Sequence, residues 1–160
     1  MDYQYKVLFV CLGNICRSPM AETIMNHLVN ENDKESFITC DSAGIIGIHA
    51  GEQADFRMRR HAFMRGYKIT HLSRQIRMSD FDEYDLIISM DESVHDSLNE
   101  KAPTIEHMNK IVRMTDYCSH ISTDHVPDPY YGGEQGFENV IDILEDACMG
   151  LLMKIKAKMQ

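Results

Sequence analysis

The chain has 160 residues, of which 44% are hydrophobic and 26% charged, a composition that can form a hydrophobic core within one domain spanning residues 1–160. Its formal net charge of −9 disfavours binding to nucleic acid and to anionic membranes. The first apolar run, Val7 to Leu12, is too short to span a membrane, and Asp2 ahead of it is atypical of a signal peptide. We therefore expect a cytoplasmic protein with neither nucleic acid nor membrane as a partner.

The five cysteines are odd in number and lack the spacing of a secreted disulfide framework, so we expect reduced thiols. Cys118, His120 and His125 are of metal-ligating types, but no fourth ligand and no paired Cys-x2-Cys accompanies them. We interpret them as loop residues and expect no metal and no cofactor.

Strands and helices are expected to alternate along the chain. Residues 6–10 form a continuous run typical of a central parallel strand, and Ser18 with Pro19 is expected to cap and begin a helix. Further strands are predicted near residues 37–41, 85–90 and 110–114. Helices are predicted over 54–65, closed by Gly66, over 91–99, and along an apolar stripe from Phe137 to Ile155. This order predicts an α/β fold with an open, mostly parallel sheet, whose ligands bind beyond the carboxyl ends of the strands.

A Cys-x5-Arg-Ser loop, from Cys11 to Ser18, follows the first strand and opens the first helix. Gly13 and Asn14 tolerate left-handed backbone angles, which lets successive N–H groups cradle an anion, and the helix directs its positive end to the same point. These groups would stabilise a nucleophilic thiolate at Cys11, while the Arg17 guanidinium could hold two phosphate oxygens. The alternative is a buried thiol beside a surface arginine, but the strand–loop–helix context favours a phosphate site.

A second candidate element supplies an acid. An ester oxygen that leaves phosphorus needs a proton unless a metal stabilises it. Asp128 lies between Pro127 and Pro129, which fix the backbone and would present the carboxyl group rigidly. The same stretch would also suit an ordinary surface turn, and alone it leaves both interpretations open. Tyr130 and Tyr131 suggest walls for an aromatic ring.

Together the two motifs resemble those of the low-molecular-weight protein tyrosine phosphatase family, and the resemblance runs from Val7 to the final helix. The motifs are Cys11-Leu12-Gly13-Asn14-Ile15-Cys16-Arg17-Ser18-Pro19 and Asp128-Pro129-Tyr130-Tyr131-Gly132. The resemblance implies a four-stranded parallel sheet with helices on both faces and a phosphate-binding loop after the first strand. It also implies a protein tyrosine phosphatase that hydrolyses phosphotyrosine in proteins, or small aryl phosphates, through a cysteinyl phosphate and releases inorganic phosphate. The resemblance further implies a monomer or a weakly self-associating protein.

The resemblance assigns roles to individual residues. Cys11 attacks phosphorus, and Asp128 protonates the departing phenol and later activates water. Arg17 and the loop's N–H groups hold the phosphate oxygens. The loop residues that would do so are Leu12, Gly13, Asn14, Ile15, Cys16 and Arg17.

Supporting roles follow from the same resemblance. Ser18 is expected to donate a hydrogen bond to the Cys11 sulfur, and Ser42 and His71 are expected to hold Asn14. Cys16 could form a reversible disulfide with Cys11, which we favour over a role in packing alone.

The walls around the substrate depart from the family pattern. Ile48 stands where the family usually has an aromatic residue, which puts peptide choice in doubt and leaves more of the ring stacking to Tyr130.

Three other functions fit the sequence less well. Arsenate reductases on this fold need further cysteines after the third strand, but residues 89–95 contain none. Protein-arginine phosphatases usually have threonine where Ile15 stands. A non-catalytic phosphate-binding module would not need the acid Asp128.

A basic helix face, formed by Arg57, Arg59, Arg60 and Arg65, fits either solvated surface charge or a docking site for acidic substrate segments.

Overall fold

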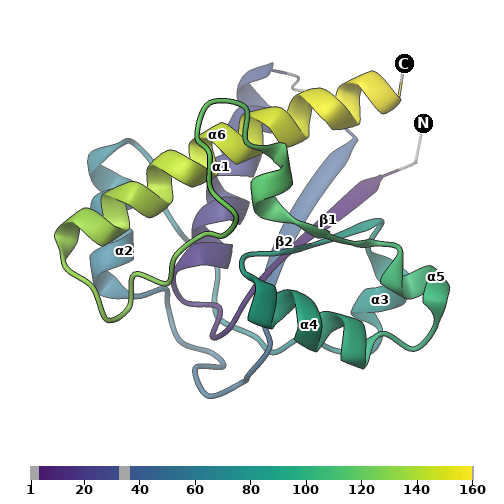
Figure 1. Ribbon diagram of the computed structural model, residues 1–160. Helices are drawn as coiled ribbons and strands as arrows, with labels where there is room; N and C mark the ends of the chain where they lie inside the picture. Colours follow the sequence, from purple (N-terminus) through teal and green to yellow (C-terminus); the bar gives the residue numbers. More distant parts are fainter. Residues whose placement is uncertain (1–3, 33–36, 160) are drawn as a thin grey trace.

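The computed structural model describes residues 4–32 and 37–159 and contains a twisted, open parallel sheet (Figure 1). The strand order β2-β1-β3-β4 places the first strand in the interior of the sheet. The α/β fold with a four-stranded parallel sheet, as expected, is confirmed. The strands are β1 (Tyr5–Cys11), β2 (Ile38–Gly44), β3 (Leu86–Ser89) and β4 (Ile111–Arg113).

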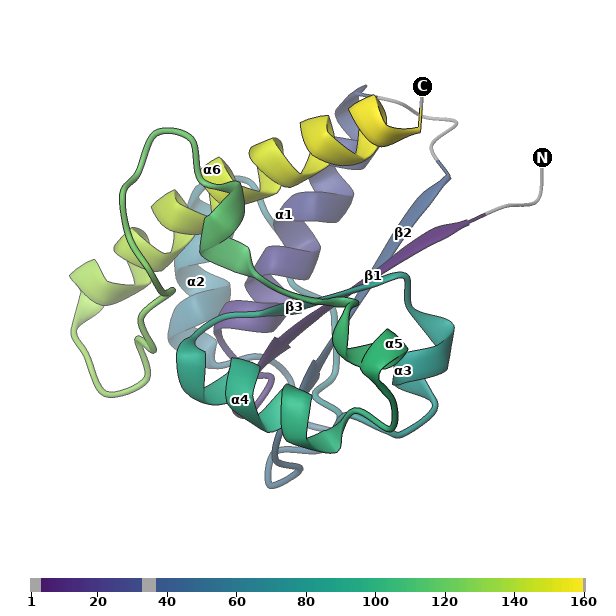
Figure 2. The ribbon, with the colours of Figure 1, turned by 45° about the vertical axis from the view of Figure 1, so that its right-hand side comes forward.

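Helices cover both faces of the sheet, as Figures 1 and 2 show from two directions. One face carries α1 (Arg17–Asn32) and α6 (Glu134–Lys158), with α2 (Phe56–Met64) packed beside α6. The other face carries α4 (Glu92–Lys101) and the short helices α3 (Asp80–Glu83) and α5 (Ile105–Met108). A 3-10 turn, η1 (Met114–Tyr117), follows β4. No helix within the described residues is long and apolar enough to cross a membrane.

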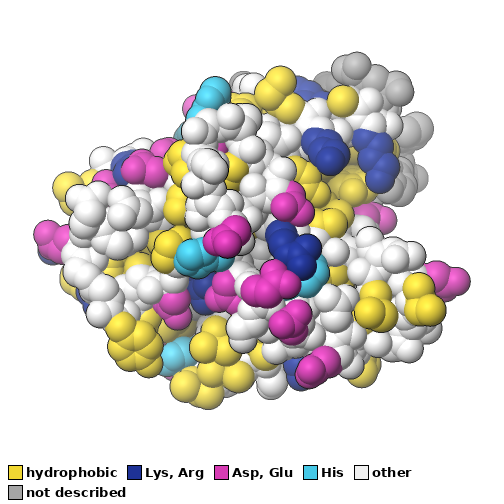
Figure 3. Space-filling view, in the orientation of Figure 1, with side chains coloured by type: hydrophobic (Ala, Val, Ile, Leu, Met, Phe, Trp, Pro, Cys, Tyr) yellow, Lys and Arg dark blue, Asp and Glu magenta, His cyan; other side chains and the backbone are white. Residues whose placement is uncertain are grey.

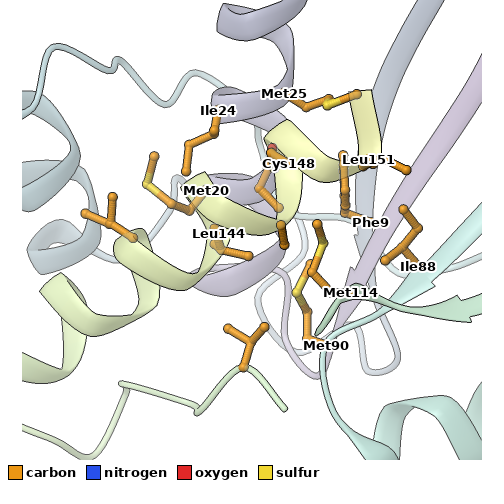
Figure 4. Packing of buried hydrophobic residues seen from close by; sticks show 14 of the residues in the cluster. Phe9, Met20, Ile24, Met25, Ile88, Met90, Met114, Leu144, Cys148 and Leu151 are labelled. Carbon is orange, nitrogen blue, oxygen red and sulfur yellow. The ribbon is translucent and has the colours of Figure 1, made fainter. Parts of the chain in front are cut away.

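Two apolar clusters hold these layers together. The larger joins α1 and α6 to one sheet face, and Figure 4 shows Met20, Ile24, Leu144 and Cys148 packed towards Phe9. The smaller cluster lies on the opposite face. It contains, among others, Leu8, Val10, Phe81, Ile87, Val94 and Leu98. Alternate residues of β1 therefore enter different clusters, which explains why the strand is apolar without interruption.

The predicted boundaries differ from the observed ones where tertiary contacts decide. β2 continues to Gly44 instead of stopping at residue 41, because it pairs with β1 residue by residue up to Cys11. α2 begins at Phe56, two residues later than predicted, since the Asp55 carboxylate accepts hydrogen bonds from the N–H groups of Arg57 and Met58. The sequence analysis predicted none of α3, α5 and η1, because one helical turn is too short to show periodicity.

A helix does begin here, as expected, but Ser18 is not its cap. Helix α1 begins at Arg17, so Ser18 already lies in its first turn. The serine hydroxyl contacts the sulfur of Cys11 instead of capping the helix.

Candidate active site

A pocket opens at the carboxyl end of β1, where the chain passes from the sheet into α1. It brings together the three predicted catalytic residues, Cys11, Arg17 and Asp128, from loops more than a hundred residues apart in sequence. The remaining lining residues are Leu12, Gly13, Ile15, Cys16, Ile46, Ile48, His49, Tyr130 and Tyr131. Every predicted substrate-ring wall residue therefore lines the same pocket.

The loop from residue 11 to 17 is shaped by hydrogen bonds on its outer side. The carbonyls of Cys11, Leu12 and Ile15 accept from the backbone N–H groups of residues 45, 46 and 55 at 2.8–3.0 Å. The Gly13 carbonyl accepts from the Ser73 hydroxyl at 3.0 Å. In a trans peptide the C=O and the next N–H point in opposite directions, so the N–H groups that follow these carbonyls are turned inwards. The N–H groups of residues 12, 13, 14 and 16 therefore face the inside of the loop, as binding of an anion requires.

Asn14 and Gly13 make different contributions to the loop. Asn14 has the left-handed backbone predicted for it, with φ of 59°, and its N–H donates to the Cys11 sulfur at 3.3 Å. Gly13 does not use the left-handed angles that it tolerates, because its φ is not positive. Gly13 instead leaves space for His49, whose ring carbon Cδ2 would lie 3.2 Å from an added Cβ. The sequence analysis did not identify His49 as a pocket residue.

The predicted supporting residues lie under the loop and form one chain of hydrogen bonds. The Arg74 backbone N–H can only donate, and it meets Asn14 Oδ1 at 2.9 Å, which fixes this atom as the acceptor. His71 Nε2, 2.8 Å from the same oxygen, must therefore carry a hydrogen. The Asn14 amide group donates to Ser18 Oγ at 2.7 Å and to Ser42 Oγ at 3.0 Å.

The Ser18 hydroxyl is 3.0 Å from the Cys11 sulfur. Ser18 Oγ accepts a hydrogen bond from Asn14, so its own hydrogen can point to the Cys11 sulfur or to the Ala43 carbonyl, which is farther away at 3.4 Å. This geometry matches the role expected for Ser18.

Behind this chain lie Glu22 and Asp41, which the sequence analysis did not single out. His71 Nδ1 is 3.2 Å from Glu22 and 3.3 Å from Asp41, and Ser42 donates to Glu22 at 2.7 Å. Burial raises the pKa of Glu22 to about 7 and lowers the pKa of His71. Both shifts favour one proton shared between the two groups, so the network can stay intact while carrying little net charge. Among residues 4–32 and 37–159, Glu22, Asp41 and His71 form the one cluster of metal-ligating types.

The Arg17 side chain is buried and held in place from one side. It donates to Asp91 Oδ2 at 2.6 Å and to the Val126 carbonyl at 3.0 Å, and its Nη2 lies 3.7 Å from Asp128 Oδ2. Burial lowers the pKa of Arg17, but the combined effect of Cys11, Asp91 and Asp128 raises it by more. The pKa of Arg17 therefore lies above its ordinary value. The sequence analysis did not include Asp91 in the site, although it directly follows the predicted third strand, 85–90, at the sheet edge where functional groups gather.

The acid loop is tied to both sides of the pocket. Asp128 Oδ1 accepts from the Tyr130 N–H at 3.0 Å, and the Val126 N–H donates to the Met90 carbonyl at 2.8 Å. From α2, Arg57 Nη2 donates to the Tyr130 carbonyl at 2.9 Å, and the guanidinium lies 5.4 Å from the Tyr130 ring centroid. These contacts hold the loop at the pocket, while Asp128 itself is exposed and its hydrogen bond with the Tyr130 N–H is one that a surface turn also makes.

The mouth of the pocket is apolar and exposed. Ile48 is 71% exposed and Tyr131 92% exposed, and the Tyr130 and Tyr131 rings meet edge to face at 5.0 Å. Cys16 lies deeper and is buried, and burial together with the charges of Asp55, Cys11 and Asp128 raises its pKa. The Cys16 thiol is therefore protonated at neutral pH, which distinguishes it from a nucleophile.

Gly44 gives a direct test of the loop's shape. A Cβ at this position would lie 2.9 Å from the Leu12 carbonyl oxygen and 3.0 Å from the carbonyl carbon of Gly13, both backbone atoms. Gly44→Ala should therefore distort the loop and lower turnover by roughly a hundredfold or more, as a misplacement of about 1 Å does in other sites. Turnover and phosphate affinity of the folded variant measure this effect. Gly133→Ala, where an added Cβ meets nothing within 4 Å, is the matched control and should keep its activity.

The assembled pocket offers a sulfur nucleophile, inward N–H groups, a buried cation and a carboxyl group, with apolar walls outside them. Such a site fits a phosphate monoester of an aromatic alcohol. Cys118, His120 and His125 lie between η1 and α6, outside the helices and strands, as expected for loop residues.

Comparison with known proteins supports this description. The family model described as low molecular weight phosphotyrosine protein phosphatase matches residues 6–160. The chain is 45% identical over 150 residues to a putative low molecular weight protein-tyrosine-phosphatase of Synechocystis, covering 94% of this chain and 96% of that one. A crystal structure of a protein tyrosine phosphatase from Entamoeba histolytica, with Hepes in its active site, superposes with a TM-score of 0.94 at 46% identity, covering 98% of this chain and 100% of that one. A Drosophila arginine phosphatase superposes with a TM-score of 0.87 at 34% identity, covering 94% and 98%.

Proposed function

Because the chain belongs to the low molecular weight phosphotyrosine protein phosphatase family, we propose that it hydrolyses phosphotyrosine in proteins, and small aryl phosphates, through a cysteinyl phosphate. One observation carries this proposal. The Cys11 sulfur, the Arg17 guanidinium and the Asp128 carboxyl group line one pocket, and aromatic and aliphatic walls surround its mouth.

In the first step the Cys11 thiolate attacks phosphorus, and the bond between phosphorus and the phenolic oxygen breaks. Asp128 transfers its proton to that oxygen, so the phenol leaves neutral. Arg17 and the N–H groups of the loop residues 12–17 hold the three equatorial oxygens, where their fixed positions stabilise the transition state. Asp91 and the Val126 carbonyl keep the guanidinium aligned meanwhile.

In the second step Asp128, now a carboxylate, takes a proton from the attacking water. The water oxygen bonds to phosphorus, the sulfur–phosphorus bond breaks and its electron pair returns to Cys11 as a thiolate. The Ser18 hydroxyl, 3.0 Å from the sulfur, stabilises this leaving thiolate. Inorganic phosphate is released and Asp128 carries a proton again.

A panel of substrates tests this proposal against the alternatives. We expect rapid hydrolysis of phosphotyrosine peptides and aryl phosphates, slow hydrolysis of phosphoserine peptides, and no arsenate reduction. Apart from Cys16, the described pocket has no thiol to relay oxidation outwards, since Cys40, Cys118 and Cys148 belong to the core between the sheet and α6. Faster hydrolysis of phosphoarginine than of phosphotyrosine would instead assign the activity reported in the name of the Drosophila relative.

We also propose that residues 1–160 act as one domain, as a monomer or a weakly self-associating protein in the cytoplasm, on phosphoproteins. The odd number of cysteines, which lack the spacing of a secreted disulfide framework, supports a reducing compartment.

Cys16 is proposed as a redox partner of Cys11. Peroxide would oxidise the Cys11 thiolate to a sulfenic acid and release hydroxide. The Cys16 thiol would then attack that sulfur, forming a disulfide and releasing water. We expect thiol reductant to restore activity after brief peroxide treatment of the wild type, and to restore less activity in Cys16→Ser. Equal recovery of the two proteins would contradict a protective role, and Cys40→Ser provides the matched thiol control.

A further inference from the structure

A groove outside the catalytic pocket runs along the exposed side of α2. Phe56 and Phe63, which are 66% and 75% exposed, lie about two helical turns apart on the same side of this helix. The groove is lined by Gln53, Phe56, Arg59, Arg60, Phe63, Tyr67, Lys68 and Ile69. It therefore combines large apolar side chains with cations, and none of the described carboxylates lines it.

Most arginines of the basic helix face already pair with carboxylates of this chain and so are not free to bind an acidic ligand. Arg57 pairs with Asp55, Arg60 with Glu134, and Arg65 with three carboxylates of α6. Arg59 differs, because its Nε donates to the Ala54 carbonyl at 2.9 Å while its guanidinium lies 5.5 Å from the Phe56 ring centroid. Within residues 4–32 and 37–159, neither Arg59 nor Lys68 has a carboxylate partner. The groove thus keeps two uncompensated cations beside two exposed phenyl rings.

The sign of this charge is unusual for the molecule. The net charge of the chain is −9. A second open groove, between α4 and the loop before Asp128, is lined mainly by carboxylates among its charged side chains. They are Asp91, Glu92, Asp116 and Asp124, against Arg113 and His125. Acidic side chains gather over this region in Figure 3. An acidic ligand would be repelled there and attracted to the α2 groove.

The α2 groove starts next to the mouth of the catalytic pocket. Both neighbours of Phe56 in the sequence contact the pocket. The Asp55 N–H donates to the Ile15 carbonyl of the phosphate loop at 2.8 Å, and Arg57 donates to the Tyr130 carbonyl. The seven-residue step from Phe56 to Phe63 covers about 10 Å of helix, which about three residues of extended peptide would span. A peptide whose phosphotyrosine occupies the pocket can therefore place its flanking residues along α2.

We propose that this groove docks an acidic segment of the phosphoprotein substrate, next to the phosphotyrosine, with a large apolar side chain between Phe56 and Phe63. The carboxylates of the segment pair with Arg59 and Lys68. The proposal rests on the proposed phosphotyrosine phosphatase activity and names the substrates that this site prefers.

Matched phosphotyrosine peptides test the docking site. The acidic peptides carry two glutamates and a leucine either before or after the phosphotyrosine, and the control peptide carries glutamines and serine at those positions. We expect kcat/KM of wild type to be roughly tenfold higher for one acidic peptide than for the control, with KM carrying the difference. In Arg59→Glu/Lys68→Glu this preference should disappear or reverse, and 0.5 M salt should weaken it in wild type.

Phe63→Ser tests the apolar contact without changing the charge, and should lower kcat/KM for the preferred peptide by roughly fivefold. The matched control is Lys101→Glu/Lys158→Glu, which makes the same change in net charge on exposed side chains away from α2. Hydrolysis of a small aryl phosphate should stay within about twofold of wild type in all these variants, because the pocket itself is unchanged.

Several outcomes would overturn the docking site. They are the absence of a preference in wild type, an equal loss in both charge-reversal variants, and groove-dependent binding to phosphatidylserine vesicles without any peptide preference. Failure of wild type to hydrolyse both aryl phosphate and phosphotyrosine would instead refute the proposed function, so the two failures are distinguishable.

Discussion

Replacing Cys11 with serine is expected to abolish turnover of phosphotyrosine and of aryl phosphates while the protein stays folded. The pocket stabilises a thiolate through the Asn14 N–H and the Ser18 hydroxyl, and a serine hydroxyl remains protonated in the same place. A neutral hydroxyl is a poor nucleophile there, since Asp128 is the protonated acid in this step and cannot take its proton. Phosphate affinity should survive, because Arg17 and the inward N–H groups are unchanged.

Steady-state turnover, calorimetric phosphate binding and thermal unfolding measure the three expectations for Cys11→Ser. The control is Cys16→Ser, which removes the other pocket thiol and should retain most of its turnover in reductant, since the buried Cys16 thiol is protonated. Comparable activities of the two variants would show that Cys11 is not the nucleophile.

Replacing Asp128 with asparagine should slow formation of the cysteinyl phosphate by about a hundredfold to ten-thousandfold for phosphotyrosine, the usual effect of a positioned acid. The amide keeps the size of the side chain, and its oxygen can still accept the Tyr130 N–H, but it has no proton to transfer. The loss should be shallower for aryl phosphates with very acidic phenols, because these phenolates leave readily without protonation. The alkaline fall in activity should also shift or flatten.

Single-turnover kinetics isolates the first step for this test, because Asp128 also serves as base in the second step. Asp124→Asn is a matched control, since Asp124 lies in the same loop and its side chain is 98% exposed. If Asp128→Asn slowed all leaving groups equally and left the pH profile unchanged, the acid would have to be another carboxylate. Asp91 would be the next candidate, although it is bound to Arg17.

Much of the fold and of the catalytic set could be predicted from the sequence alone. The apolar run before Cys11, the loop up to Arg17 and the helix after it are contiguous, so local backbone preferences and periodicity reveal them without knowledge of the fold. The two prolines beside Asp128 likewise mark a fixed loop. Resemblance to a family then joined these two separate segments and assigned Ser18, Ser42 and His71, whose contacts agree with the expected roles.

The tertiary structure decided the contacts between segments that are distant in sequence. The hydrogen bond from Arg17 to Asp91, the contact of His71 with Glu22 and the hydrogen bond from Arg57 to the Tyr130 carbonyl each join elements that no spacing rule connects. The helix cap predicted for Ser18 from its local preference was also wrong. In the folded protein its hydroxyl contacts the sulfur of Cys11 instead of the N–H groups at the start of the helix. Propensities describe a residue's own backbone, whereas hydrogen-bond partners and charge environments are fixed only when packing brings separate elements to the same sheet edge.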